Sequence, residues 1–335
     1  MRTVLIVLLT LLLLAGLALV FAGFHMARQQ FRRRFQGGGD YFPYFSQLHP
    51  GWCREPISFS GSQGDTLRGF LFSYPEHPPK ALLVVYHGYG MSLDDYLPEC
   101  EYFCRRDYLV LAFDGSGTGH SDGILRGLPQ HILDLQACLR HICADPQLGH
   151  LPLLLYGHSW GGYGVDCIGA TESFPVRGIV SASAFYNSLS ALAPYTHRHY
   201  GPLAPLPLLG VRLYQRLHFG RLCGLTAADG LSRQSCPVFI VQSDDDSILP
   251  FSQNYRRLYR RFRQDSRFTF LPLTGRNHNI TTPPEADREK RRLLKLLHQP
   301  VPPQEARDQI QLLKTQVDYD LLRRFGDFLD SCLKP

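Results

Sequence analysis

The sequence has few of the features that define several large classes of protein. No two cysteines have the C-x-x-C spacing typical of zinc sites, and nine cysteines in 335 residues are an odd number, not a disulfide framework. Three methionines and two tryptophans exclude a methionine-rich binding surface. No segment repeats with a period of about 20–50 residues, which excludes solenoids and propellers.

An excess of one charge is also largely missing. The chain has 35 basic and 29 acidic residues, and its net charge of +6 is too small to indicate a nucleic-acid partner. Hydrophobic residues make up 44% of the chain, which is enough for a sizeable core and excludes global disorder. The length allows one large α/β domain or two small domains.

A long apolar run lies at the N-terminus. Residues 4–24 carry no charge and one hydroxyl group, and at about 1.5 Å per helical residue they span the roughly 30 Å core of a bilayer. A cleaved signal peptide would have a shorter apolar run, about 7–15 residues, before a small-x-small site. Because Phe24, His25 and Met26 follow Gly23, we predict a transmembrane anchor over residues 1–27, with a signal segment as the alternative.

The residues that flank this run predict its orientation. Arg2 precedes the run, whereas Arg28 and residues 32–34, all arginine, follow it. The positive-inside rule therefore places the rest of the chain in the cytoplasm, with an extracytoplasmic domain as the alternative. We interpret residues 28–52 as a juxtamembrane linker with aromatic side chains suited to the bilayer interface: Phe31, Phe35, Tyr41, Phe42, Tyr44 and Phe45.

Short apolar runs alternate with helical patterns in the rest of the chain. Residues 56–61 and 67–73 predict a β-hairpin with Gly64 and Asp65 at its turn. Runs this apolar, alternating with helices, are typical of strands buried in a doubly wound, mostly parallel sheet, where ligands bind at the carboxyl ends of the strands. We expect strands at 81–86, 108–113, 151–156, 176–183, 237–242 and 267–273, and helices at 93–105, 128–144, 161–171 and 252–262.

A G-x-S-x-G run follows the strand expected at 151–156 and opens a helix. It consists of residues 157–161, with Ser159 at its centre. A serine in a sharp strand-to-helix turn has a strained backbone and needs glycine on both sides. We therefore predict Ser159 as a nucleophile, assisted by the positive end of the helix dipole. A structural serine in a glycine-rich turn is the alternative.

Acyl transfer also requires two hydrogen-bond donors for the oxyanion. The backbone N–H of Trp160, the residue after the nucleophile, is one candidate. The loop at residues 87–90 follows an earlier strand, and the N–H of Tyr89 is the second candidate. Taken alone, this loop is also compatible with an ordinary turn after a strand.

A base and an acid are expected later in the chain, in the order Ser, Asp, His. His278 follows the last expected strand and is the candidate general base. Three adjacent aspartates follow the strand before it, and chemistry alone does not choose among Asp244, Asp245 and Asp246. A triad of this kind works without a metal or an organic cofactor, so we expect none.

The motifs together resemble those of the α/β-hydrolases, in particular the monoacylglycerol lipase and serine aminopeptidase-like branch. The resemblance covers about residues 56–333 and implies an α/β-hydrolase domain at 53–335. Aligned on Pro250, the pattern G-x-x-D-x-x-V-P of this branch implies Asp246 as the triad acid, although Ser243 replaces the usual glycine. The motifs are HGYG at 87–90, FDGSGTGHSDG at 113–123, GHSWGG at 157–162, SDDDSILP at 243–250 and GRNHN at 275–279.

The resemblance also implies a helical lid, which we assign to residues 186–236. An aminopeptidase must hold a substrate ammonium with acidic groups, so an excess of basic residues favours an uncharged or anionic ester. Arginines that face solvent or membrane are the alternative interpretation. The lid charges are Arg198, Arg212, Arg216, Arg221 and Arg233 against Asp229. A second insert, charged and helical, is expected at 284–316, before a final helix at 319–333.

These observations predict a membrane-anchored serine hydrolase that cleaves carboxylic esters through a Ser159–Asp246–His278 triad and an acyl-enzyme. Leucines and prolines in the lid suggest lipid-like substrates, so we expect medium or long acyl chains to be preferred over acetate. The alternatives are an aminopeptidase or amidase, an acyltransferase with the same triad, and a non-catalytic binding protein with this fold. The expected partners are an ester substrate and the membrane, not nucleic acid.

Overall fold

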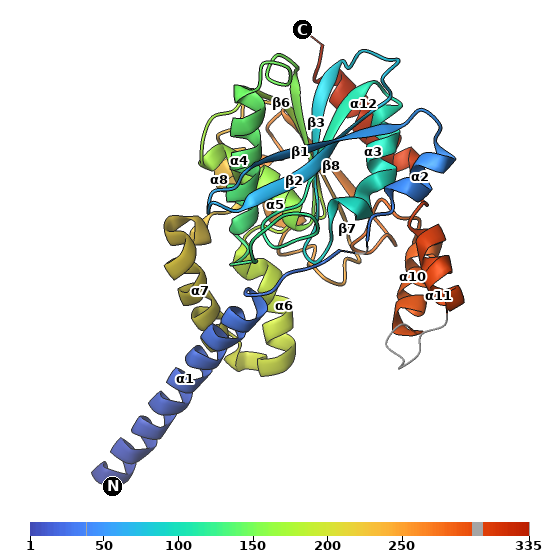
Figure 1. Cartoon of the computed structure of the whole chain (residues 1–335). Helices are drawn as coiled ribbons and strands as arrows, with labels where there is room; N and C mark the ends of the chain where they lie inside the picture. The colour runs from blue at the N-terminus through green and yellow to red at the C-terminus, as the bar shows by residue number, and fades with distance from the viewer. Residues whose placement is uncertain (38, 297–303, 335) are drawn as a thin grey trace.

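A computed structural model describes residues 1–37, 39–296 and 304–334 of the chain. Its centre is an eight-stranded sheet with the order β1-β2-β4-β3-β5-β6-β7-β8 (Figure 1). The hairpin of β1 (Cys53–Ser60) and β2 (Thr66–Ser73) is antiparallel, and β2 pairs antiparallel with β4. The parallel strands are β3 (Ala81–Tyr86), β4 (Tyr108–Phe113), β5 (Leu153–His158), β6 (Val176–Ala182), β7 (Val238–Ser243) and β8 (Phe268–Leu273).

The central strands are apolar throughout because helices cover both faces of the sheet. Along β3, Leu83 and Val85 pack in one buried cluster, whereas Val84 packs in a second cluster on the other face. Side chains of α3 (Leu97–Cys104) and α12 (Tyr319–Ser331) belong to the first cluster. The second cluster includes side chains of α4 (Gln130–Ala144), α5 (Trp160–Cys167), α8 (Ala227–Leu231) and α9 (Tyr255–Phe262).

The predicted strands and helices of the domain are all present, with small shifts at their ends. The helix expected at 93–105 begins as a 3-10 turn, η1 (Leu93–Tyr96), and continues as α3. Pro98 lies in the first turn of α3, where its missing N–H is tolerated. The helix expected at 161–171 is α5 followed by the 3-10 turn η2 (Ile168–Ala170).

Two helical segments interrupt the alternation of strands and helices. Between β6 and β7, the predicted lid contains α6 (Ser188–Tyr200), η3 (Gly201–Leu203), α7 (Pro205–Phe219), η4 (Gly220–Gly224) and α8. The predicted insert at 284–316 contains α10 (Pro284–Leu296) and α11 (Gln304–Leu313) and lies on the opposite flank from α7 (Figure 1). Its proline-containing residues 297–303 lie outside the described residues.

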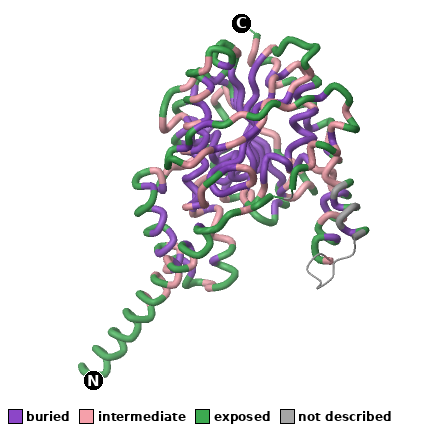
Figure 2. The backbone as a smooth tube through the Cα atoms, viewed as in Figure 1, coloured by how far each residue is buried: buried purple, intermediate pink, exposed green. Residues whose placement is uncertain are grey.

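The apolar N-terminal run forms one long helix, α1 (Arg2–Gln30), which projects away from the domain (Figures 1 and 2). The helix is long and apolar enough to cross a membrane, and a signal sequence would pass the same test. Its last turns pack against α7. A Cβ atom on Gly23 would lie 2.0 Å from the carbonyl oxygen of Pro207, so the two backbones approach too closely for any larger residue.

Some of the aromatic side chains expected at the bilayer interface are instead buried in the domain. Phe31 is 2% exposed and Phe45 is 1% exposed, so the interface prediction is wrong for both. Phe45 lies on a short helix, α2 (Phe42–Leu48), which covers the hairpin side of the sheet. The ring of Phe42 packs on that of Trp52 at a centroid distance of 4.9 Å. Phe42 and Phe45 thus cover apolar surface of the hairpin, whereas Phe31 packs in another cluster with Tyr214.

Candidate active site

Ser159 lies in a strained turn between β5 and α5. Its backbone angles are φ 56° and ψ −110°, in a region that side chains other than glycine rarely adopt. A Cβ atom on Gly157 would lie 2.4 Å from the oxygen of Gly161, and one on Gly161 would lie 2.1 Å from the oxygen of Tyr86. Both glycines are therefore required for the turn, which holds Ser159 at the carboxyl end of the sheet.

Three of the residues predicted from the sequence lie in a hydrogen-bonded row. The Oγ–H of Ser159 donates to Nε2 of His278 at 2.9 Å, and Nδ1–H of His278 donates to Oδ2 of Asp246 at 2.9 Å. They come from the ends of β5, β8 and β7, which meet at one edge because these strands are parallel. All three residues are less than a tenth exposed. The arrangement has the geometry of a nucleophile, a base and an orienting acid.

The carboxylate of Asp246 is held by four hydrogen bonds. Its Oδ1 accepts from the backbone N–H groups of Ile248 at 2.9 Å and Leu249 at 2.8 Å, while Oδ2 also accepts from Nε2 of Gln242 at 3.0 Å. Burial alone would raise the pKa of Asp246, but the hydrogen bonds and the charge of His278 outweigh it and hold the pKa below its ordinary value. Asp246 is therefore ionised at neutral pH.

The two neighbouring aspartates make different contacts. Oδ1 of Asp245 accepts from the hydroxyl of Ser243 and from the backbone N–H of Asn277, at 3.0 Å. Oδ2 of Asp244 accepts from the hydroxyl of Thr274 at 3.0 Å. The structure thus brings Asp246, which the family pattern also indicates, to the histidine, and turns the other two carboxylates toward the loops beside it.

The two amides predicted to bind an oxyanion lie on the loops that flank Ser159. Trp160 is the first residue of α5, and Tyr89 lies in the loop after β3. Within the described chain, neither backbone N–H donates a hydrogen bond to another protein group. The rings of the two residues also contact each other, with centroids 5.4 Å apart. Neither amide is therefore committed to another protein group among the described residues.

His158, in the same turn as Ser159, forms hydrogen bonds that connect the loops around the site. Its Nε2–H donates to the backbone oxygen of His278 at 3.1 Å, and its Nδ1 accepts from the hydroxyl of Tyr96 at 2.7 Å. That hydroxyl accepts in turn from the N–H of Gly88 at 2.9 Å. Burial lowers the pKa of His158 to about 3, so the ring stays neutral. The chain of bonds joins the loops that carry Tyr89, Ser159 and His278.

A cavity of about 500 Å³ lies beside Ser159. Most of its lining is apolar, and Arg33 is the one charged residue among the described residues that line it. The helix α1 contributes to its wall, which the sequence did not predict. The apolar lining includes Met26 and Ala27 of α1, Leu192 of α6, Val211 of α7, and Phe185 and Leu249 from loops.

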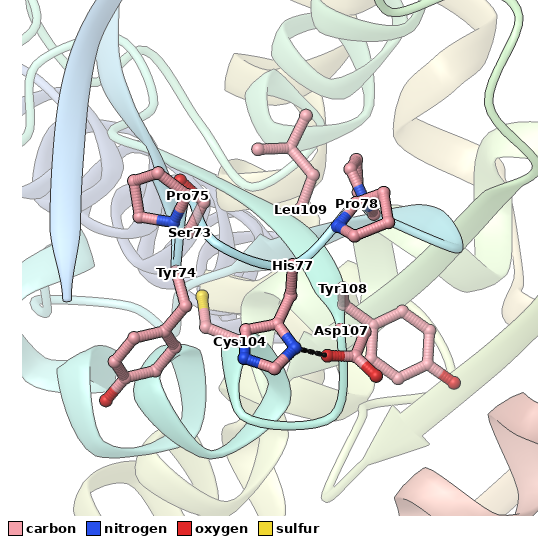
Figure 3. A pocket seen from close by; sticks show the side chains of 10 residues that line it. Ser73, Tyr74, Pro75, His77, Pro78, Cys104, Asp107, Tyr108 and Leu109 are labelled. Carbon is pink, nitrogen blue, oxygen red and sulfur yellow. Dashed lines mark ion pairs between the residues drawn. The ribbon is translucent and has the colours of Figure 1, made fainter. Parts of the chain in front are cut away.

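A smaller cavity of about 180 Å³ lies at the opposite edge of the sheet, near the start of β4. Figure 3 shows the ring of His77 turned toward Asp107, with Nδ1 and Oδ1 3.2 Å apart. Cys104 also lines this cavity, and burial raises the pKa of its thiol to about 12, which disfavours the reactive thiolate. We therefore assign the candidate active site to the cavity at Ser159.

The sheet and the serine turn are those of the α/β-hydrolase fold, and comparisons with known proteins agree. The family model described as serine aminopeptidase S33 matches residues 77–219. The chain is 25% identical to a monoacylglycerol lipase of Mycolicibacterium smegmatis over 264 residues, which are 69% of this chain and 92% of that protein. The chain is also 30% identical to a polyketide transferase of Gibberella fujikuroi over 119 residues. The match covers only 34% of this chain and 37% of the length of that protein.

The fold also matches solved structures. The esterase Pf2001 of Pyrococcus furiosus superposes with a TM-score of 0.62 at 17% identity, over 91% of this chain and 98% of that one. The chain therefore has the α/β-hydrolase fold, as predicted, and its sequence is similar to the monoacylglycerol lipase and serine aminopeptidase-like branch.

Proposed function

We propose that the protein is a serine hydrolase that cleaves carboxylic esters, using Ser159, His278 and Asp246. The observation that carries the proposal is the row of two 2.9 Å hydrogen bonds from Ser159 through His278 to Asp246. Similarity to a monoacylglycerol lipase supports an ester as the substrate. The apolar cavity at Ser159 supports an acyl chain as the group that binds there.

In the proposed mechanism, Oγ of Ser159 attacks the carbonyl carbon of the ester while Nε2 of His278 takes the serine proton. The charge of Asp246 stabilises the imidazolium, and the N–H groups of Tyr89 and Trp160 bind the oxyanion. The tetrahedral intermediate then collapses, and His278 returns the proton to the leaving alcohol. Water, activated by the same histidine, attacks the acyl-enzyme and releases the acid.

The lining of the cavity favours an ester over the amine-bearing substrate of an aminopeptidase. A substrate ammonium would be taken out of water, and this requires a nearby carboxylate. Among the described residues that line the cavity, none is acidic, and Arg33 would repel an ammonium. The five arginines of residues 186–236 are all exposed, so the composition of the predicted lid is a weaker argument than the cavity itself.

We also propose that α1 anchors the enzyme in a membrane, with the hydrolase domain on the cytoplasmic side. The helix is apolar over residues 4–24, and residues 4–15 are all exposed to solvent in the isolated chain. A soluble protein rarely exposes an apolar surface of this size. The arginines that follow the apolar run support the cytoplasmic orientation.

The test of the proposed function is covalent labelling by a fluorophosphonate, which reacts with an activated serine. The folded wild-type protein should be labelled, and Ser159→Ala should not. Ser183→Ala is a matched control, because Ser183 is also buried at the end of a central strand and also has a positive φ, 47°. Labelling that persists in Ser159→Ala, or a wild type that folds and is not labelled, would contradict the proposal.

A further inference from the structure

The end of α1 is fixed to the domain by close backbone contacts with α7. Besides the contact of Gly23 with Pro207, a Cβ atom on Gly210 would lie 1.9 Å from the backbone oxygen of Val20. Ala27 is 3% exposed, and the ring of Phe31 stacks on that of Tyr214 with centroids 6.1 Å apart. The last turns of α1 are therefore part of the domain and not a flexible tether.

The same turns reach the candidate active site. Nε2 of Gln30 donates to the hydroxyl of Tyr89 at 2.7 Å, and Ala27 and Phe31 share a buried cluster with Trp160. Tyr89 and Trp160 carry the two amides proposed to bind the oxyanion. One face of α1 thus contacts the catalytic loops directly.

The cavity at Ser159 runs between α1 and the helices of the predicted lid. Met26 of α1 lines it, as do Leu192 and Tyr195 of α6, and Ser159 is also part of its lining. A volume of about 500 Å³ is within the range of about 300–1,000 Å³ found for ligand sites. An elongated apolar group bound at Ser159 would therefore contact the side of α1.

Exposed apolar side chains surround the place where α1 leaves the domain. Phe21 of α1 is 70% exposed, Leu203 of η3 is 55% exposed and Leu209 of α7 is 46% exposed. Leu209 is adjacent to Gly210, which touches α1 at Val20, so these side chains lie at the same level of the helix. Figure 1 shows α7 packed against the end of α1 that meets the domain, with α6 near the same end. The anchoring membrane would cover this apolar surface.

We infer that the last turns of α1, around Met26, form one wall of the acyl-chain site, and that the substrate is a lipid ester of the membrane that holds α1. Its acyl chain enters between α1 and α6 directly from the bilayer, and its carbonyl group reaches Ser159 at the level of the headgroups. This inference rests on the proposed serine hydrolase function. In it, the anchor selects the substrate as well as holding the enzyme at the membrane.

The test compares two tryptophan substitutions on adjacent residues of α1, in the full chain in lipid nanodiscs. Met26→Trp would fill the cavity, whereas His25→Trp places the same side chain on an exposed position that does not line it. The measured quantity is the rate of Ser159 labelling by a dodecyl and by an ethyl fluorophosphonate. We expect wild type to react faster with the dodecyl probe, and Met26→Trp to slow that probe by about tenfold or more without affecting the ethyl probe. His25→Trp should affect neither.

A second variant avoids any effect of tryptophan on folding. Met26→Cys shortens the side chain and introduces no bulk, and its thiol can be modified with a maleimide after the protein has folded. Modification should slow the dodecyl probe only, and wild type treated in the same way controls for the native thiols, of which Cys53 and Cys143 are exposed. Equal effects on both probes, or no effect on either, would overturn the inference. If the folded wild type reacted with neither probe, this result would instead overturn the proposed function.

Discussion

The hydrogen bonds of Asp246 predict what Asp246→Asn does to the histidine. The amide nitrogen of asparagine must replace one carboxylate oxygen. At the Oδ1 position it would face two backbone donors, the N–H groups of Ile248 and Leu249, which cannot rearrange. At the Oδ2 position it would face Gln242 and Nδ1 of His278. The histidine can respond by moving its proton from Nδ1 to Nε2, so we expect the nitrogen at the Oδ2 position.

A proton on Nε2 prevents His278 from accepting the proton of Ser159. The base is then lost while both backbone hydrogen bonds to Oδ1 remain, so the fold should be retained. In the chymotrypsin-type triad the corresponding change lowers kcat by about 10⁴, which equals about 5.4 kcal/mol at 1.36 kcal/mol per factor of ten. We expect a loss of roughly 10³–10⁴ in kcat here, because the bond between the aspartate and the histidine has the same role.

The assay is the hydrolysis of p-nitrophenyl butyrate by the full chain in detergent, with a thermal melt to verify folding. Asp245→Asn is the matched control. Asp245 is the neighbouring residue, and its carboxylate accepts hydrogen bonds from Ser243 and Asn277, not from His278. The control should lower kcat by less than about tenfold, because the histidine keeps its tautomer. A loss below about tenfold in Asp246→Asn, or a larger loss in Asp245→Asn, would refute the assignment of the triad acid.

Two further predictions concern stability. Burial raises the pKa of Glu99 from 4.5 to about 7, so between these values the folded state keeps a proton that the unfolded chain has released. Stability should therefore fall as the pH rises through this window, with a contribution from Glu99 of up to about 3 kcal/mol. Glu99→Gln should make the decline smaller, and the remainder comes from Asp134 and Asp166, whose pKa values burial raises to about 6 and about 8. The same difference in melting temperature between about pH 4.5 and pH 7.5 in both proteins would contradict this. Deleting residues 1–36 should lower the melting temperature and abolish labelling of Ser159, because Ala27 and Phe31 are buried against the catalytic loops. Deleting only residues 2–19 should preserve both, and equal behaviour of the two truncated proteins would contradict the structural role of the last turns of α1.

The parts of the site that the sequence predicts are those controlled by local chain chemistry. The turn at Ser159 requires glycine at 157 and 161, and the sequence displays this requirement directly. Parallel strands end at one edge of a sheet, so the histidine after β8 is expected near the serine after β5. The choice of Asp246 is different, because three adjacent carboxylates are chemically alike. Only the path of the loop, or a resemblance to a family, indicates which one faces the histidine.

The roles of His158 and Tyr96 could not be predicted, because both depend on contacts between distant segments. His158 occupies a variable position of the G-x-S-x-G run, where nothing in the local sequence requires a histidine. Its hydrogen bonds go to the backbone of His278 and to Tyr96, which lies in η1 after β3. Such a network is determined by the packing of loops from three strands, and no periodic pattern in the sequence reports it.

The packing of the apolar N-terminal helix α1 is the clearest example of a feature that the sequence could not predict. Residues 4–24 are apolar on every face. A pattern of this kind indicates an apolar environment but does not show which residues contact other parts of the protein. Gly16 and Gly23 are equivalent in the sequence, yet a Cβ atom on Gly16 would meet nothing within 4 Å while one on Gly23 would collide with Pro207. The difference arises from α7, a segment far along the chain whose Gly210 completes the contact. Because that contact holds the last turns of α1 against the domain, and Met26 on these turns lines the cavity at Ser159, the proposed anchor and the proposed acyl-chain site share one helix. A fragment that begins after residue 36 would lack this part of the cavity wall.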